Sequence, residues 1–204
     1  MAVTTYAELK TAIADWMDRS DLTSYLGDFI TFAEGHLNRN LRHRSMVTST
    51  DLTPSSNVCT LPTDYLHYVR VVELASTRRE LKYITPSAVD QLYPSREAGL
   101  AWHFTIIGST LTAYPLSTND IELTYRQKIP ALSDSNTTNW LLTASPELYL
   151  RASQMMALEF INENGTPRQQ ATAVLTQKLI DDLNQESMLG EYYSSGVHVN
   201  GPTP

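Results

Sequence analysis

The spacing of apolar residues changes twice along the chain, and this order restricts the fold more than any other feature. Residues 5–41 and 146–189 repeat apolar residues three and four apart, which indicates helices that pack on one face. Residues 45–128 carry short runs rich in β-branched and aromatic residues, which indicate strands. Helices segregated from strands predict an α+β fold, with the terminal helices in an α-helical bundle and an antiparallel β-rich layer inserted between them.

Capping residues and prolines predict where the helices begin. Thr5 and Glu8 have the spacing of a capping box, in which each side chain accepts from a free amide at the helix start. Three further starts are predicted where a capping residue precedes proline, at Thr85–Pro86, Ser145–Pro146 and Thr166–Pro167.

The strand region contains one clear hairpin signal. Gly108–Ser109 separates two β-rich runs at 102–107 and 110–114, which predicts a tight turn between paired strands. Residues 121–128 alternate apolar and polar side chains and are expected to complete a meander with this hairpin.

The last predicted helix and the residues after it differ in composition. Residues 167–189 repeat apolar side chains, and the face of this helix that packs on the bundle is expected to carry Val174, Leu175, Leu179 and Leu183. Residues 190–204 contain three glycines and two prolines and have no helical period. We therefore expect a single domain over 1–189 and an extended C-terminal tail over 190–204.

Charge and hydropathy exclude two classes of partner. The chain has 15 Lys and Arg against 22 Asp and Glu, and its net charge of −7 argues against a dedicated nucleic-acid binder. The same balance suits a protein past which DNA slides, because a basic lining would hold each phosphate. No apolar run reaches the roughly 20 residues of a membrane span, so no membrane contact is expected. The first residues lack the pattern of a signal peptide, and we expect a protein made and kept in a cytoplasm.

Motifs that carry chemistry are missing from the sequence. It has no glycine-rich phosphate loop, no His-Glu-x-x-His and no Gly-x-Ser-x-Gly, so we expect no cofactor, no metal and no catalytic residue. Cys59 is the single cysteine and is expected to be a small apolar side chain in a strand. His36 and His43 lie seven residues apart, which is a poor spacing for a shared metal ligand.

One short segment concentrates positive charge. Arg39, Arg42 and Arg44 fall at the end of the second predicted helix, where cations favour the negative end of the helix dipole. The alternative interpretation is a contact with an acidic protein surface or with DNA. The two interpretations are compatible.

Several segments taken together resemble a known family. The chain is similar to the head-to-tail adaptors (connectors) of short-tailed bacteriophages, of the tail tubular protein A type. The resemblance covers about residues 4–189 and is strongest from Ile129 to Leu150. The segments that carry it are Thr5–Trp16, Asp28–Glu34, Asn38–Arg42, Leu61–Leu66, the pair Leu81 and Tyr83 ahead of Thr85–Pro86, and Ile129–Leu150 with its Ile-Pro-Ala-Leu-Ser-Asp-Ser-Asn start.

The resemblance implies a structural virion protein without enzymatic activity. It implies a ring of twelve copies in the neck, between the portal protein and the tail nozzle protein, around a channel through which double-stranded DNA passes without sequence specificity. It also implies a helical layer facing the portal and a β-rich layer facing the tail. Assembly is expected in the cytoplasm of the host bacterium, before DNA ejection.

The resemblance, together with the charge and length of particular segments, predicts roles for individual residues. The C-terminal tail is expected to become ordered on the portal, with apolar side chains that offset the entropy lost. Its contact residues would be Glu191, Tyr192, Tyr193, Val197, His198 and Val199, and Arg39, Arg42 and Arg44 would touch the portal or the DNA. The loop over 130–140 is long enough to reach a neighbouring subunit, through Leu132, Asp134, Asn136 and Trp140. Alternatively, Trp140 packs against the start of the closing helices.

Three other functions remain as alternatives at this point. An adaptor could also cleave cell-wall glycan, which would need two carboxyl groups that converge across a cleft. A tail-completion protein of a long-tailed phage also forms rings. A monomeric ligand-binding domain is the third alternative, and no motif speaks for it.

Overall fold

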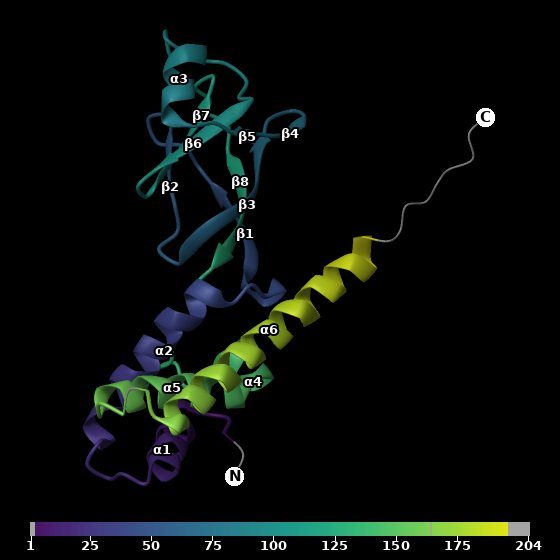
Figure 1. Ribbon diagram of the computed structural model, residues 1–204. Helices are drawn as coiled ribbons and strands as arrows, with labels where there is room; N and C mark the ends of the chain where they lie inside the picture. Colours follow the sequence, from purple (N-terminus) through teal and green to yellow (C-terminus); the bar gives the residue numbers. More distant parts are fainter. Residues whose placement is uncertain (1–2, 164, 196–204) are drawn as a thin grey trace, which may run out of the picture. The chain divides into compact units, whose positions relative to one another are not determined.

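The computed structural model describes residues 3–163 and 165–195, and side chains as far as residue 188. The chain divides into two compact units (Figure 1). Unit 1 comprises Met1–Ser45 and Ile129–Pro204, and unit 2 comprises Met46–Lys128. Helices fill the described part of unit 1 and strands dominate unit 2, which confirms the α+β class. No helix in the described ranges is long and apolar enough to cross a membrane.

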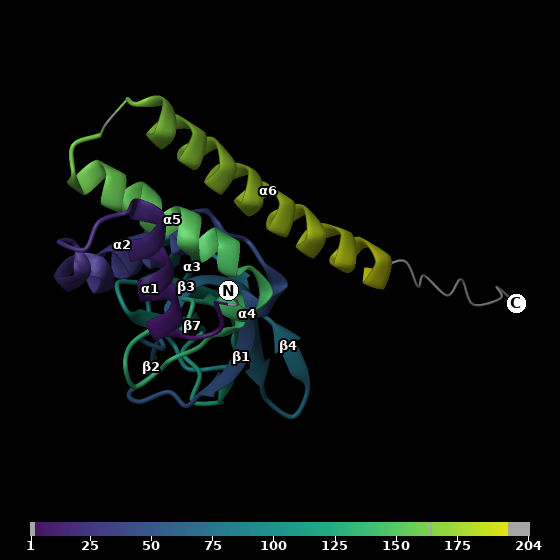
Figure 2. The same ribbon diagram turned by 90° about the horizontal axis from the view of Figure 1, so that it is seen from below.

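Unit 1 is a helical bundle built from both ends of the chain. Helix α5 contacts α2, α1 and α6, and it lies between α2 and α6 (Figure 2). The N-terminal part of the bundle consists of α1 (Tyr6–Met17), the 3-10 turn η1 (Thr23–Tyr25) and α2 (Leu26–Asn40). The C-terminal part consists of α4 (Trp140–Ala144), α5 (Pro146–Phe160) and α6 (Pro167–Ser195). A second 3-10 turn, η2 (Arg44–Met46), leads from unit 1 into unit 2 along the chain.

The predicted helix starts are confirmed. The Thr5 side chain accepts from the Glu8 amide at 3.3 Å and the Glu8 carboxylate accepts from the Thr5 amide at 3.0 Å, so the capping box is complete. Helices α3 (Pro86–Leu92), α5 and α6 each begin at the proline that the sequence indicated.

Helix α4 was not predicted, and α6 is longer than expected. Asn139 caps α4 by accepting from the Leu142 amide, and this capping residue lies within the predicted loop over 130–140. Helix α6 continues to Ser195, so the expectation of an extended tail from residue 190 is wrong for 190–195. A single interior glycine, Gly190, costs a helix only about 1 kcal/mol, which its neighbours outweigh. Residues 196–204 lie outside the described residues.

The buried face of α6 also differs from the expected one. Val174 and Leu175 are 68% and 41% exposed, whereas Thr172, Thr176 and Ile180 are buried. The two threonine hydroxyls donate to carbonyls four residues earlier in α6, at 2.9 and 2.8 Å. Because the hydroxyls are satisfied within the helix, these side chains can be buried at little cost, and apolar periodicity does not detect them.

Unit 2 consists of two four-stranded sheets and the short helix α3. One sheet has the order β1-β8-β3-β4 and the other has the order β2-β7-β6-β5. The bounds are β1 (Val47–Leu52), β2 (Val58–Thr60), β3 (Tyr65–Leu74), β4 (Arg78–Glu80), β5 (Lys82–Tyr83), β6 (His103–Ile107), β7 (Thr110–Tyr114) and β8 (Ile121–Gln127). Apolar side chains from both sheets share one core, which includes Cys59, Val71, Phe104, Leu111 and Leu123.

The predicted hairpin is confirmed and the predicted meander is wrong. Strands β6 and β7 pair antiparallel around Gly108, whose φ of +60° suits a residue without a side chain. Strand β8 pairs instead with β1 and β3 in the other sheet. Both edges of β7 are already paired, with β2 and β6, so β8 has no place beside it.

A fully buried carboxylate holds the crossing between the sheets of unit 2. Glu73 on β3 accepts from the Ala101 amide at 3.2 Å, from the Ser117 hydroxyl at 2.6 Å and from the Asn119 side chain at 3.1 Å. Residues 115–120 connect β7 to β8, so Glu73 fixes the segment by which the chain changes sheets.

Replacement of Glu73 should therefore destabilise unit 2 strongly. Glu73→Ala leaves buried donors without an acceptor and should lower the free energy of unfolding by about 3 kcal/mol. Glu122→Ala is the matched control, since Glu122 pairs with the exposed Arg78 at the surface of the same sheet, where the expected loss is about 1 kcal/mol or less. Urea unfolding of both variants measures the difference, and equal losses would contradict this role of Glu73.

Candidate interaction surfaces

The predicted basic segment is an exposed part of unit 1. Arg39 lies in the last turn of α2, and Arg42 and Arg44 follow it, all three with exposed side chains. None of their guanidinium groups forms an ion pair with a described residue, although Arg42 donates to the Leu41 carbonyl. Three cations without acidic partners can bind anionic groups of another molecule.

Helix α6 fastens the backbone of this basic segment. The Asn184 side chain accepts from the Arg42 amide at 2.6 Å, and the Ser187 hydroxyl accepts from the Arg44 amide at 2.8 Å. Asn184 also donates to the Asn40 carbonyl at 3.3 Å. Residue 191 follows Ser187 after one helical turn, about 6 Å at 1.5 Å per residue. The basic segment and the last turns of α6 therefore lie at the same end of unit 1.

Of the predicted portal-binding residues, only the first three fall within described backbone. Glu191, Tyr192 and Tyr193 belong to the last turns of α6. Val197, His198 and Val199 lie outside the described residues. Their contact with a portal stays a prediction.

Trp140 packs against a histidine of its own unit. Its ring stacks on His43, with 5.1 Å between the ring centroids and 14° between the planes. Burial lowers the pKa of His43, against an opposing effect of Glu186. This contact fits the interpretation in which Trp140 packs the start of the closing helices. An anchoring role on a neighbouring subunit stays a prediction.

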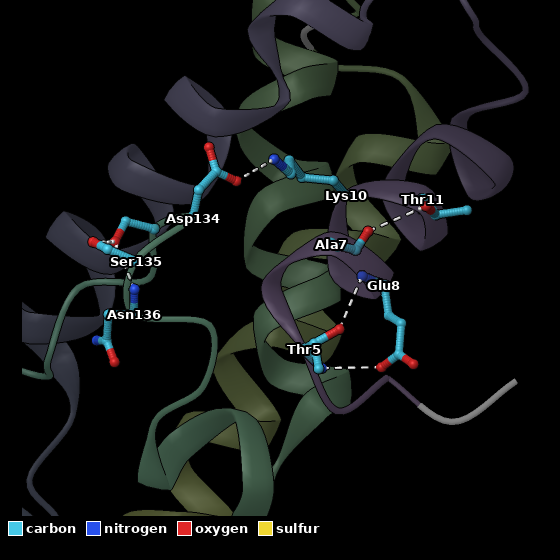
Figure 3. A network of polar contacts seen from close by, with 9 residues as sticks. Thr5, Ala7, Glu8, Lys10, Thr11, Asp134, Ser135 and Asn136 are labelled. Atoms are coloured by element: carbon cyan, nitrogen blue, oxygen red, sulfur yellow. Dashed lines mark hydrogen bonds and ion pairs between the residues drawn. The ribbon is translucent and has the colours of Figure 1, made fainter.

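The loop that precedes Trp140 lies on its own helices. The Tyr6 amide donates to the Thr137 carbonyl at 2.7 Å, and Lys10 on α1 lies 3.1 Å from Asp134 (Figure 3). Leu132 is buried in unit 1 and so cannot serve as a surface contact. Asp134 and Asn136 are exposed, and they are the members of the predicted inter-subunit set that a neighbour could reach.

A buried polar network, which the sequence did not reveal, holds this loop in place. The Glu34 carboxylate on α2 accepts from the Leu132 amide at 2.8 Å and from the Tyr149 hydroxyl at 3.1 Å. Asn139 donates to the Tyr149 hydroxyl and to the Pro130 carbonyl, both at 2.7 Å. Burial raises the pKa of Glu34, and burial together with the nearby Glu34 charge raises the pKa of Tyr149. In the sequence, the one sign of this network is that the charged Glu34 lies among the apolar residues of the second predicted helix.

Cys59 and three histidines, His36, His43 and His103, lie in ordinary structural settings within the described part of the chain. Burial raises the pKa of Cys59 to about 11, so its thiol stays protonated at neutral pH. His103 accepts from or donates to the Tyr93 hydroxyl at 2.6 Å within unit 2. His36 and His43 join no cluster of three metal-ligating residues in the part of the chain that the structure describes.

The chain thus combines a helical bundle with an inserted β-layer, and the bundle carries exposed arginines that form no ion pair with a described residue. The model of the SU10 adaptor protein family matches the chain over residues 4–199. The chain belongs to the SU10 adaptor protein family, which confirms the resemblance to phage head-to-tail adaptors. It is therefore a structural adaptor of a bacteriophage virion. No curated protein sequence matches the chain significantly.

The raised pKa of Glu34 makes a prediction about pH. The folded protein binds this proton more tightly than the unfolded chain, so the stabilising contribution is complete at low pH and is lost as pH rises through the folded pKa. Glu34→Gln keeps an acceptor oxygen but does not titrate. Wild-type stability should therefore fall relative to Glu34→Gln as the pH rises from about 4 through the raised pKa of Glu34.

Urea unfolding at several pH values measures this difference. Glu34→Ala serves as the comparison, because it leaves the Leu132 amide and the Tyr149 hydroxyl without an acceptor and should be about 2 kcal/mol less stable than Glu34→Gln at every pH. Parallel profiles for wild type and Glu34→Gln would show that Glu34 is not the titrating group.

Proposed function

We propose that this adaptor forms a closed ring, expected to contain twelve copies, which joins the portal to the tail nozzle and surrounds the DNA channel. The match to the SU10 adaptor family over residues 4–199 is the observation that carries this proposal. Assembly in the host cytoplasm, on portals already present, belongs to the same proposal.

The end of unit 1 formed by the basic segment and α6 is the proposed portal-binding edge. Arg39, Arg42 and Arg44 supply positive charge, and α6 fixes their backbone through Asn184 and Ser187. A backbone held in this way lowers the entropy that must be lost when the arginines bind. The C-terminal residues would add a second contact at the same edge.

The net charge of the chain suits a channel wall. At −7 per copy, a ring of several copies repels the DNA backbone on the whole, and passing DNA is not held by counterion release. The proposed contact with DNA is therefore transient and independent of base sequence.

Two truncations test the proposed docking of the C-terminal residues. Removal of residues 190–204 should leave a folded protein that no longer joins portal rings, because Ser187 is the last residue of α6 with a described bond to the rest of unit 1. Removal of residues 196–204 alone separates the contribution of the helical turns from that of the remaining residues. Co-sedimentation with portal rings measures binding, and circular dichroism checks folding.

Normal portal binding by the shorter protein would overturn this assignment. If the protein without 196–204 binds portal rings and the protein without 190–204 does not, the contact lies on the last turns of α6.

We also propose that the adaptor makes and breaks no covalent bond. Among the described residues, the buried carboxylates are Glu34 and Glu73, and hydrogen bonds to the protein occupy both. Glycan cleavage would need an acid and a second carboxyl group that both face a cleft. Cell-wall material in a zymogram should therefore stay intact, as with boiled protein, and a clearing zone would contradict the proposal.

A further inference from the structure

One side of unit 1 carries a groove in which an aromatic side chain stands exposed. Trp16 of α1 is 51% exposed, and it borders a hollow lined by Leu158 of α5 and by Arg168 and Leu175 of α6. The Arg151 guanidinium lies over the Trp16 ring, 4.7 Å from its centroid. We call this surface the Trp16 groove.

The Trp16 groove continues into a larger hollow. Trp16 also borders a cavity of about 470 Å³, lined by Leu142, Pro146 and Leu150 among others. This volume falls within the range that accommodates compact apolar groups. Tryptophan and arginine are the residue types enriched where a few contacts dominate a protein interface.

The other side of unit 1 carries an exposed aromatic patch. Phe32 is 60% exposed, Phe160 is 54% exposed and Tyr25 is 44% exposed. The Phe160 ring contacts Tyr25 and the buried Phe29, with centroids 5.0 and 5.4 Å apart, so the patch is formed before any partner binds. We call Tyr25, Phe32, Met156 and Phe160 the aromatic patch.

The two surfaces lie on opposite faces of α5. Arg151 borders the groove and Phe160 belongs to the patch, and nine residues at 3.6 per turn place them about 180° apart around the helix axis. The partners of α5 agree, since α1 and α6 flank the groove and α2 flanks the patch. Two unlike surfaces on opposite faces of one unit permit head-to-tail contact, which closes into rings.

The charges of the two surfaces are complementary. Arg168 borders the groove without an acidic partner among the described residues, and it donates to the Trp16 carbonyl at 2.8 Å. Arg151 lies 3.5 Å from Glu147 on its own helix, which neutralises part of its charge. The patch carries Glu159, which lines its hollow, and Asp28 one turn before Phe32, and neither forms an ion pair with a described residue. Opposite charges around apolar centres favour one register over others.

We propose that the aromatic patch of one copy docks into the Trp16 groove of the next copy, so that opposite faces of α5 carry the two halves of the subunit contact. This inference rests on the proposed ring. The occupant of the groove is a second copy of this chain, since the same unit presents the matching patch and a ring needs each copy to present both.

Cross-linking between introduced cysteines tests the inference in the full chain. Cys59 is buried, so an introduced surface thiol is the reactive one. Thr31→Cys places a thiol on α2 beside Phe32, and Ala171→Cys places one in the lining of the groove, and both leave the apolar anchors in place. With a short bifunctional maleimide, neither variant alone should give a product, whereas their mixture should give covalent dimers and no larger species.

The double variant should give a ladder that ends at the copy number of the ring. Thr31→Cys combined with Met188→Cys is the matched control, because Met188 is 69% exposed on the same helix as Ala171 but about 25 Å further along it. Each preparation is tested alone and on portal rings, with native mass spectrometry as the independent measure of assembly.

The outcomes separate this inference from the proposed function. Rings that form without cross-linking above the Met188→Cys control would overturn the inference and leave the proposed ring intact. Cross-linking of Thr31→Cys with itself would also overturn it, because that product requires a symmetric contact. Absence of assembly even on portal rings would overturn both.

Discussion

The structure of unit 1 depends on one junction, where the chain returns to the bundle after the inserted β-layer. Residues 46–128 separate α2 from the closing helices, so the bundle must bring together two distant segments. Two side chains one helical turn apart on α2 make this connection: Asn38 accepts from the Ile129 amide and Glu34 accepts from the Leu132 amide, both at 2.8 Å. Apolar burial alone has no direction, whereas these bonds fix where the returning chain meets α2.

Each unit uses a buried glutamate to position a connection, and neither glutamate is left for chemistry. Glu34 holds the loop that leads into α4, and Glu73 holds the crossing from β7 to β8. Removing either partner of such a bond leaves a buried polar group unsatisfied, which penalises alternative chain paths. The two buried glutamates thus specify the path of the chain, and neither belongs to a surface proposed to contact partners.

The features that local chemistry determines could be predicted from the sequence. Proline fixes its own φ near the helical value and lacks the amide that a helix start leaves free, which is why Pro86, Pro146 and Pro167 marked their helices correctly. The sheet of β8 could not be predicted, because pairing depends on which distant edges are free. The buried face of α6 escaped prediction because threonine hydroxyls bond within the helix and Thr172 and Thr176 then pack as apolar side chains. The partners of Glu34 could not be predicted, since they lie about a hundred residues away in the sequence.

Helix α6 shows why a binding protein departs from simple amphipathic patterning. Its side toward the bundle buries threonine, serine and one isoleucine, while Val174 and Leu175 remain exposed. If α6 packed only within the monomer, aliphatic residues at the buried positions and polar residues at 174 and 175 would make the fold more stable, since each buried aliphatic side chain contributes about 1.5–3 kcal/mol. The apolar side chains that the monomer leaves exposed become favourable when another surface covers them, as the groove beside Leu175 allows. Helix α6 thus packs on its own bundle through Thr172, Thr176 and Ile180, and it offers Leu175 to the proposed subunit contact.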